Sequence, residues 1–326
     1  MDKETRDALE ARFTKLRIVE LQERPVQGRF DAAHLREVNR RIFQDLPPLG
    51  VSDVTPGEYR EPVPSDKDWV KHRELNTVKT TYTVVYSPMS DGTRAALDQV
   101  LERQARPGAL SQLKPQEFVA HMADLYTQLD AIHPFRDGNS RTLREFTREL
   151  AEASGYHMEW ERIGTSDAGR DILYIARDVS VNRLAVPHLK NDDTRIAVGN
   201  ALDRLDGNRD LEDVLKGIVR PSRAIAFERL TEIKALEKHP ELQPIYDDQR
   251  SLRETLLAKY PAQPERRAEA IASFRETVLK QLDAGNIIRA RQPENAKVSP
   301  SKETEAEPSA RRPPPRTVKP PTERER

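Results

Sequence analysis

The stretch of sequence that decides the fold covers residues 133–144 and reads His133-Pro134-Phe135-Arg136-Asp137-Gly138-Asn139-Ser140-Arg141-Thr142-Leu143-Arg144. Before it, residues 115–132 place apolar side chains at steps of three and four, which predicts an amphipathic helix. Pro134 ends this helix, because proline disfavours the helical conformation at the residue before it. A second helical pattern begins near Asn139 or Ser140 and stops near Gly155. The stretch is therefore predicted to contain a tight loop between two helices.

A loop of this kind is suited to bind an anion. Backbone N–H groups at a helix N-terminus lack partners within the helix and carry partial positive charge. Gly138 allows the backbone to approach a ligand closely, and Asn139 can cap the helix or donate to a phosphate oxygen. Arg141 and Arg144 lie on one side of the helix, and guanidinium groups suit phosphate oxygens. We therefore expect Gly138, Asn139, Ser140, Arg141 and Arg144 to bind phosphate.

Two further residues in the stretch add chemistry to this predicted phosphate site. Asp137 offers the hard oxygen ligand that Mg²⁺ prefers in combination with phosphates. His133 can accept a proton from an incoming hydroxyl, because the pKa of histidine lies near neutrality. A lone histidine before a helix is more often structural, so the prediction depends on the residues that follow it. Together they can move a phosphoryl-type group onto an alcohol.

The stretch resembles the motif of the Fic family, His-Pro-Phe-x-[Asp/Glu]-Gly-Asn-Gly-Arg-x-x-Arg, except that Ser140 stands where the family has glycine. The likeness extends over about residues 35–177 and includes Gly57-Glu58-Tyr59-Arg60. The resemblance implies a mainly α fold, a Fic-type helical bundle with a small β-hairpin flap. It also implies a protein adenylyltransferase, an enzyme that transfers AMP from ATP to a target protein.

The resemblance assigns a role to each residue of the motif. His133 would deprotonate a Ser, Thr or Tyr hydroxyl of the target, and Phe135 would anchor the loop in the core. Asp137 would hold Mg²⁺ on the α- and β-phosphates of ATP, and the backbone of residues 138–140 would form the anion hole. Arg141 and Arg144 would bind the β- and γ-phosphates.

A strand-like run of β-branched and aromatic residues covers positions 80–86. The resemblance places a target-docking flap at about residues 77–88, where Thr83, Val84 and Val85 would pair with an extended segment of the target. An ordinary core hairpin is the alternative interpretation.

Regulation is predicted from a motif that this sequence lacks. Many Fic proteins carry [Ser/Thr]-x-x-x-Glu-[Gly/Asn], whose glutamate pairs with the second motif arginine, here Arg144. In this sequence Glu294-Asn295 is the one glutamate followed by Gly or Asn, and the position four residues before it is Ala290. Inhibition by such a glutamate is therefore absent from the chain, or it is supplied by a separate small antitoxin protein that blocks Arg144.

Ser140 leaves two alternatives to AMP transfer. In the first alternative the chain is a catalytically silent binding module with a Fic fold. In the second it is a Fic transferase that uses another phosphate-containing donor. If the chain is an active enzyme, the resemblance implies that it is a bacterial toxin or a secreted effector.

The composition excludes several classes of partner. Lys and Arg together number 54, as do Asp and Glu, so bulk attraction to nucleic acid is not expected. No apolar stretch is long enough for a membrane span, and the N-terminus lacks a secretory signal pattern. We expect a protein of the bacterial cytoplasm.

Three segments are expected along the chain. Residues 1–200 would form the Fic domain with its N-terminal helices, and residues 201–297 a C-terminal helical region of unknown role. Residues 298–326 are rich in proline and charge, which predicts a disordered tail. The clustered arginines of this tail also fit a C-terminal signal for translocation into another cell.

Overall fold

The computed structural model describes residues 1–164, 166–205 and 207–286. The chain divides into two units, Met1–Arg289 and Ala290–Arg326, and the second lies wholly outside these residues. The prediction of a disordered tail at 298–326 therefore concerns residues that the structure does not describe.

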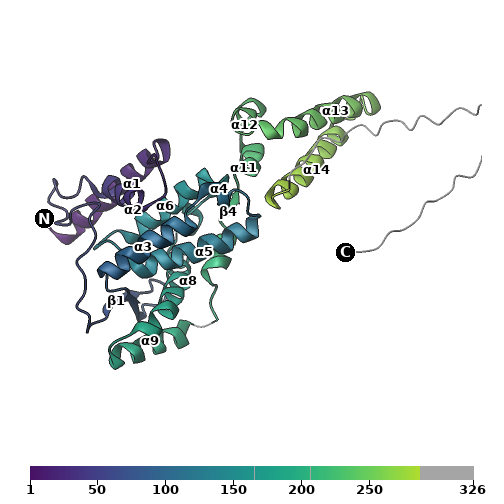
Figure 1. Ribbon diagram of the computed structural model, residues 1–326. Coiled ribbons are helices and arrows are strands. Elements are labelled where there is room, and N and C mark those ends of the chain that lie inside the picture. Colours follow the sequence, from purple (N-terminus) through teal and green to yellow (C-terminus); the bar gives the residue numbers. More distant parts are fainter. Residues whose placement is uncertain (165, 206, 287–326) are drawn as a thin grey trace, which may run out of the picture. The chain divides into compact units, whose positions relative to one another are not determined.

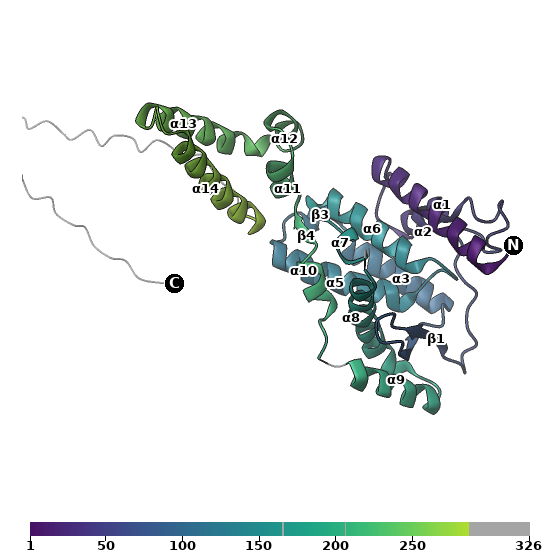
Figure 2. The same ribbon diagram turned by 180° about the vertical axis from the view of Figure 1, so that it is seen from behind.

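Two central helices carry the predicted loop. α5 (Pro115–Ile132) and α6 (Asn139–Ala153) have the bounds expected from Pro115, Pro134 and Gly155. α5 also contacts α3 (Asp91–Gln104) and α8 (Asp167–Ala185), so it is covered on several sides (Figures 1 and 2). The largest hydrophobic core forms around it and includes Phe118, Met122, Leu129, Leu143, Phe146 and Leu150.

Two N-terminal helices cover one side of α6. α2 (Ala32–Phe43) packs against α6, and α1 (Lys3–Glu23) packs against α2. Their contact buries a second cluster of side chains, among them Leu21, Val38, Ile42 and Leu46.

Four short strands form two antiparallel pairs. β1 (Trp69–Glu74) pairs with β2 (Thr81–Tyr86), with Trp69 opposite Tyr86 and Glu74 opposite Thr81. β3 (Tyr156–Met158) pairs with β4 (Val219–Pro221). The strand-like run at 80–86 correctly marks β2, and β2 packs against α8 and α9 (Asp192–Leu205). The predicted fold class, mainly helical with a small hairpin, is confirmed.

Short elements complete the first part of the chain: α4 (Pro107–Leu110), α7 (Glu161–Gly164), the 3₁₀ turn Val186–His188 and α10 (Leu211–Lys216). The stretch from Asp192 to Lys216 forms two helices, α9 and α10. Gly207, between these two helices, has a φ of 77°, which breaks a right-handed helix.

The C-terminal helices have a core of their own. α11 (Ser222–Arg229), α12 (Glu232–Lys238), the 3₁₀ turn Pro240–Leu242, α13 (Gln243–Lys259) and α14 (Pro264–Asp283) follow one another. They bury Phe227, Ile245, Tyr246, Val278 and Leu282, whereas α10 packs into the larger core around α5.

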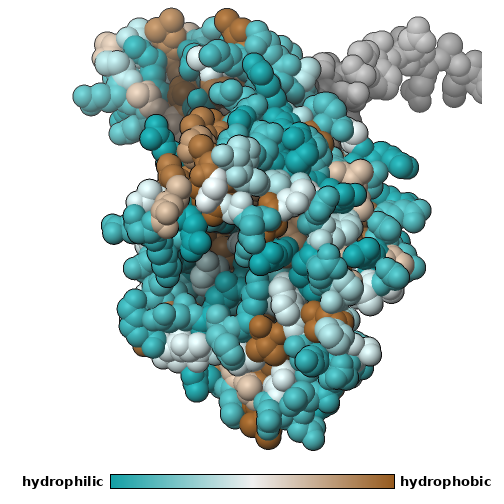
Figure 3. Space-filling view, turned by 90° about the vertical axis from the view of Figure 1, so that its left-hand side faces the viewer, coloured by the Kyte–Doolittle hydropathy of each residue, from teal (hydrophilic) through white to brown (hydrophobic). Residues whose placement is uncertain are grey.

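The surface reflects the charged composition. Figure 3 shows one face on which hydrophilic residues predominate and hydrophobic residues form small patches. Among the described residues, no helix combines the length and apolar character needed to cross a membrane.

Candidate active site

The C-terminal end of α5 is held by side chains from two other segments. The last carbonyl groups of a helix have no partner within it, so they need donors from elsewhere. Ser87, directly after β2, donates from Oγ to the carbonyl of Ile132 at 2.8 Å. Arg60 donates from Nε to the carbonyl of His133 at 2.9 Å, and its other arm reaches the carbonyl of Ser87. The loop therefore leaves α5 in a fixed direction.

His133 is the first residue of this loop and sits in an unusual conformation. Its φ of 49° and ψ of 61° lie in the left-handed region, which non-glycine residues seldom adopt. Its ring lies 3.8 Å from the ring of Tyr86 and 5.3 Å from that of Trp69, centre to centre. Burial lowers the pKa of His133 to about 4, so the imidazole is neutral at pH 7.

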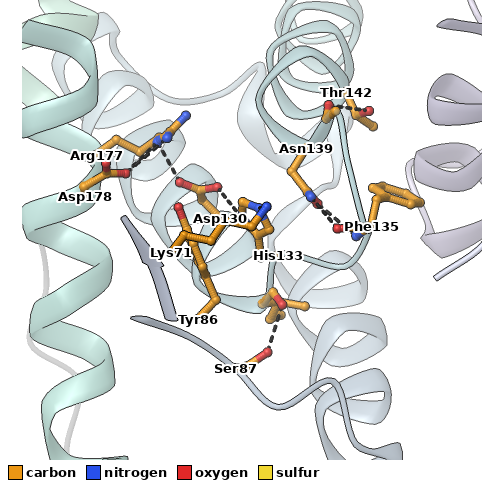
Figure 4. Close-up of polar contacts among 12 residues, drawn as sticks. Lys71, Tyr86, Ser87, Asp130, His133, Phe135, Asn139, Thr142, Arg177 and Asp178 are labelled. Atoms are coloured by element: carbon orange, nitrogen blue, oxygen red, sulfur yellow. Dashed lines mark hydrogen bonds and ion pairs between the residues drawn. The ribbon is translucent and has the colours of Figure 1, made fainter. Parts of the chain in front are cut away.

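Both ring nitrogens of His133 have a polar neighbour (Figure 4). Nδ1 lies 3.2 Å from Oδ1 of Asp130, on the last turn of α5. Nε2 lies 3.4 Å from Nζ of Lys71, a residue of β1. The buried Asp130 carboxylate also forms an ion pair with Nε of Arg177 at 2.8 Å. The ring is thus fixed on one side by a carboxylate and approached on the other by a cation.

Asn139 holds the loop closed through its side chain. Its Nδ2 donates to the carbonyl of Phe135 at 2.6 Å, and its Oδ1 accepts from the N–H of Phe135 at 2.9 Å. Phe135 is buried in the main core, as predicted for an anchor, and its ring meets that of Tyr59. Because both polar ends of the Asn139 side chain are occupied, its backbone N–H is the group left to face a ligand.

Gly138 is the N-terminal cap of α6, and its φ of 76° requires glycine. A Cβ there would lie 2.1 Å from Cζ of Phe43, on α2. The next residue but one, Ser140, lies in the first turn of α6 and is not among the residues with a positive φ. Serine therefore occupies the motif's usual glycine position without backbone strain.

A cavity of about 400 Å³ opens beside this loop. Six of its lining residues are Lys or Arg and none is Asp or Glu; the twelve are Lys71, Arg73, His133, Gly138, Asn139, Ser140, Arg141, Arg144, Arg170, Leu173, Tyr174 and Arg177. All five predicted phosphate-binding residues lie in this wall together with His133. Such a wall attracts a ligand with several negative charges.

The cations of the cavity differ in their partners. Arg144 and Lys71 form no ion pair with a carboxylate among the residues that the structure describes, whereas Arg141 contacts Glu10 of α1. Arg141 also donates to Oγ1 of Thr14 on the same helix, at 3.1 Å. Glu294-Asn295, the pair considered for a contact with Arg144, lies outside the described residues. No pattern in the sequence indicated the contact of Glu10 with the first motif arginine.

Asp137 faces a neighbouring cavity of about 320 Å³ that shares Gly138 and Arg141 with the first. Its side chain is exposed, and within the described ranges it accepts no hydrogen bond and forms no ion pair. No group of three or more His, Cys, Asp or Glu residues in that part of the chain could hold a metal ion alone. An exposed carboxylate without a partner, next to a phosphate cradle, fits Mg²⁺, which keeps several waters and takes its other ligands from phosphates.

The predicted docking residues lie inside the fold. Thr83, Val84 and Val85 are buried in β2, and Asn182 of α8 occupies the outer edge of that strand. Asn182 Oδ1 accepts from the N–H of Val85 at 3.0 Å, and Nδ2 donates to the carbonyl of Thr83 at 2.9 Å. The sheet has only these two strands, so the outer edge of β1 also has no strand neighbour in the part of the chain described.

The geometry agrees with comparisons to known proteins. A family model described as the Fic/DOC family matches residues 29–151. Residues 29–151 are thus similar to the Fic/DOC family. The protein adenylyltransferase VbhT of Bartonella schoenbuchensis is 28% identical over 172 residues, which are 50% of this chain and 30% of that protein. A probable protein adenylyltransferase Fic of Salmonella typhimurium is 37% identical over 131 residues, which are 40% of this chain and 54% of that protein.

A solved structure gives a further comparison. It is the N-terminal Fic domain of a putative cell filamentation protein from Bartonella quintana with bound ADP, at 21% identity and a TM-score of 0.46. The alignment covers 69% of this chain and 89% of that one. The curated relatives are longer than the shared region: the chain covers between 26% and 54% of their length.

Several residues in the cavity wall were not anticipated from the sequence. Lys71 and Arg73 come from β1, while Arg170, Tyr174 and Arg177 come from one face of α8. The spacing of four and three residues on α8 was the available signal, since such positions share a helix face. Nothing in the sequence indicated that this face meets the loop after α5.

Proposed function

We propose that the protein transfers AMP from ATP to a Ser, Thr or Tyr hydroxyl of a target protein. The observation that carries this proposal is the cavity itself, whose wall contains six Lys or Arg residues, no Asp or Glu, and a buried neutral histidine. A polyphosphate suits this wall, and a neutral imidazole beside it can accept a proton. The Fic/DOC match and the adenylyltransferase names of the relatives support the same reaction.

The phosphates would bind at the start of α6. Backbone N–H groups of the first turn of a helix favour an anion, and Gly138, the N-terminal cap of α6, lines the cavity at this point. Arg144 is available to the terminal phosphates because it has no carboxylate partner among the described residues. Arg141 becomes available once Glu10 releases it.

His133 would act as the base. The target hydroxyl gives its proton to Nε2, and its oxygen forms a bond to the α-phosphorus. The bond between this phosphorus and the oxygen that bridges to the β-phosphate breaks, and pyrophosphate leaves. Lys71 stands 3.4 Å from Nε2, so the hydroxyl must take the place of its ammonium group. That ammonium can then pair with a phosphate oxygen.

Asp137 is the residue that would hold Mg²⁺, for the reasons of exposure and missing partners given above. The ion would supply neutralisation of charge on the phosphates. Removal of Asp137 should therefore weaken nucleotide binding in the presence of Mg²⁺ and have little effect with EDTA.

The target would dock along β1. This strand has one edge without a strand neighbour in the described chain, and Lys71 and Arg73 bring it to the cavity wall. An extended peptide can add to such an edge through backbone hydrogen bonds. We therefore assign pairing to β1, while Thr83, Val84 and Val85 support it from β2.

The biological role that fits this reaction is that of a bacterial toxin or translocated effector. The available guanidinium of Arg144 is also where a separate small antitoxin would act. Expression in bacteria tests this role: the wild-type chain alone should arrest growth, and His133→Ala should not. Normal growth with the wild type, despite transfer activity in vitro, would remove the toxin role.

Labelled ATP tests the reaction itself. The purified chain is incubated with Mg²⁺, a bacterial lysate and ATP labelled at the α- or the γ-phosphate. Label transferred to protein from the α-phosphate alone supports AMP transfer. Label from the γ-phosphate indicates another phosphate chemistry, and label from neither indicates a silent binding module.

A pair of histidine variants completes this test. His133→Ala should abolish the transfer, since general base catalysis contributes about 10²–10⁴-fold. His239→Ala is the matched control, because His239 lies among the C-terminal helices and contacts Glu241. Transfer that persists in His133→Ala would show that the base has been assigned wrongly.

A further inference from the structure

We propose that Asp130 is a positioning residue that fixes the tautomer of His133, and that Arg177 keeps the Asp130 carboxylate ionised away from water. This inference rests on the proposed role of His133 as the base. It concerns two residues outside the loop motif that have no part in the reaction as derived so far.

The contact between Asp130 and His133 defines which nitrogen carries the proton. Asp130 is fully buried and lies three residues before His133, so both side chains emerge on one side of the end of α5. A neutral imidazole has one N–H, and a buried carboxylate can only accept. The 3.2 Å contact therefore places the proton on Nδ1 and leaves the lone pair of Nε2 directed to Lys71 and the cavity.

Arg177 explains how a carboxylate can be ionised at this depth. Its side chain is 1% exposed, and its Nε lies 2.8 Å from Oδ2 of Asp130. Burial opposes ionisation of Asp130, but the charge of Arg177 and the hydrogen bond from His133 outweigh it and lower the pKa of Asp130. An unpaired charge at this position would be strongly unfavourable.

The pair continues into a larger network with balanced charge. Arg177 also lies 3.1 Å from Oδ1 of Asp178, and Oδ2 of Asp178 accepts from Arg73 at 2.9 Å. Tyr82 donates its hydroxyl to the same oxygen at 2.8 Å. Two carboxylates and two guanidinium groups thus alternate from α5 through α8 to β1, as Figure 4 shows for its first three members. The group of charges next to His133 therefore has no net charge.

The charged and titratable groups that face His133 come from every element around it. Asp130 lies on α5, Lys71 on β1, Arg177 on α8 and Tyr86 on β2, while Arg60 binds its carbonyl. Asp130 is the one carboxylate among them, and it stabilises the imidazolium that forms when the target hydroxyl is deprotonated. The other groups either disfavour that charge or are neutral.

The tautomer can be observed without nucleotide or target. In the full-length chain with ¹⁵N-labelled histidine, NMR distinguishes a protonated from an unprotonated ring nitrogen. The signal of His133 among the seven histidines is assigned by its loss in His133→Ala. We expect a protonated Nδ1 and an unprotonated Nε2 at pH 7. A protonated Nε2 in the wild type would overturn the inference, whether or not the protein transfers AMP.

Variants test whether Asp130 is the cause. The single change Asp130→Asn leaves Arg177 without its partner and can prevent folding, so the main variant is the double change Asp130→Asn with Arg177→Gln. It removes one charge of each sign and leaves Asp178 paired with Arg73. The fixed Nδ1–H tautomer should give way to a mixture, and kcat for transfer should fall about 10²–10⁴-fold.

The matched control is Asp171→Asn. Asp171 is also a buried carboxylate, but it lies on α8, accepts a hydrogen bond from Thr77 and does not contact His133. It should leave the tautomer unchanged. A double variant with an unchanged tautomer and an unchanged kcat would overturn the role of Asp130. A wild type with the expected tautomer but no AMP transfer would instead refute the proposed function and leave the positioning intact.

Discussion

The close approach of Gly138 to Phe43 gives a quantitative test of how the phosphate loop is built. The perturbation is Gly138→Ala. An alanine at φ 76° costs about 1–2 kcal/mol because its Cβ approaches the following carbonyl oxygen. The same Cβ would lie 2.1 Å from Cζ and 2.3 Å from Cε2 of the Phe43 ring, which must move within a packed cluster. Overpacking of this kind costs about 1–3 kcal/mol, so we expect a total loss of about 2–5 kcal/mol.

Urea denaturation of a four-member cycle measures the two contributions separately. Phe43→Ala removes the ring that blocks the added Cβ and by itself costs about 3–5 kcal/mol. If the steric contribution is real, the double variant is more stable than the sum of the single effects predicts, by about 1–3 kcal/mol. The backbone contribution at Gly138 remains in both backgrounds.

Gly199→Ala is the control for this cycle. Gly199 lies within α9, and an added Cβ there meets nothing within 4 Å. Alanine at this position should stabilise the helix by up to about 1 kcal/mol. Strict additivity of Gly138→Ala and Phe43→Ala would refute the reasoning, because it would show that the ring does not limit the space at Gly138.

Two further predictions concern the charge of the site. Burial lowers the pKa of His133 to about 4, and the neutral form is the base, so the transfer rate should stay level from pH 8 to about pH 5 and decline only as the pH falls through about 4. Initial rates across this range decide, and a midpoint near the ordinary value of about 6.5 would contradict the buried environment. Glu10→Gln should free Arg141 and tighten the binding of a non-hydrolysable ATP analogue by about two- to fivefold, the range for a half-exposed ion pair. Calorimetry measures this affinity, with Glu20→Gln on the same helix as control, and unchanged or weaker binding would show that Glu10 does not compete with the nucleotide.

The sequence predicts those parts of the fold whose helix ends are marked by proline or glycine. α5 and α6 begin and end where Pro115, Pro134 and Gly155 place them. α1 was not predicted, because it is polar around most of its circumference and buries only Thr14 and Leu21. β1 was missed for a related reason, since it carries charged residues at alternate positions and is stabilised by pairing with β2.

The site likewise contains residues that the sequence predicts and contacts that it does not. The residues of the loop could be predicted because they follow one another in the chain, and the structure brings them to one cavity with His133. The contacts that set their state join residues far apart in sequence. Glu10 of α1 contacts Arg141 of α6, and Arg177 of α8 contacts Asp130 of α5. No local pattern in a single sequence contains such pairs.

The outer edge of β2 is covered by Asn182, which limits how an extended target segment could pair with the hairpin. A segment that docks as proposed would add to the outer edge of β1. Successive side chains of a strand point to opposite faces, and Lys71 and Arg73 belong to the face that lines the cavity. In any peptide paired with β1, only every second residue can present its side chain to His133. If the target docks along β1 as proposed, selection of the acceptor would obey a parity rule: a shift of the peptide by two residues would offer a new hydroxyl position, whereas a shift by one would turn the whole set away.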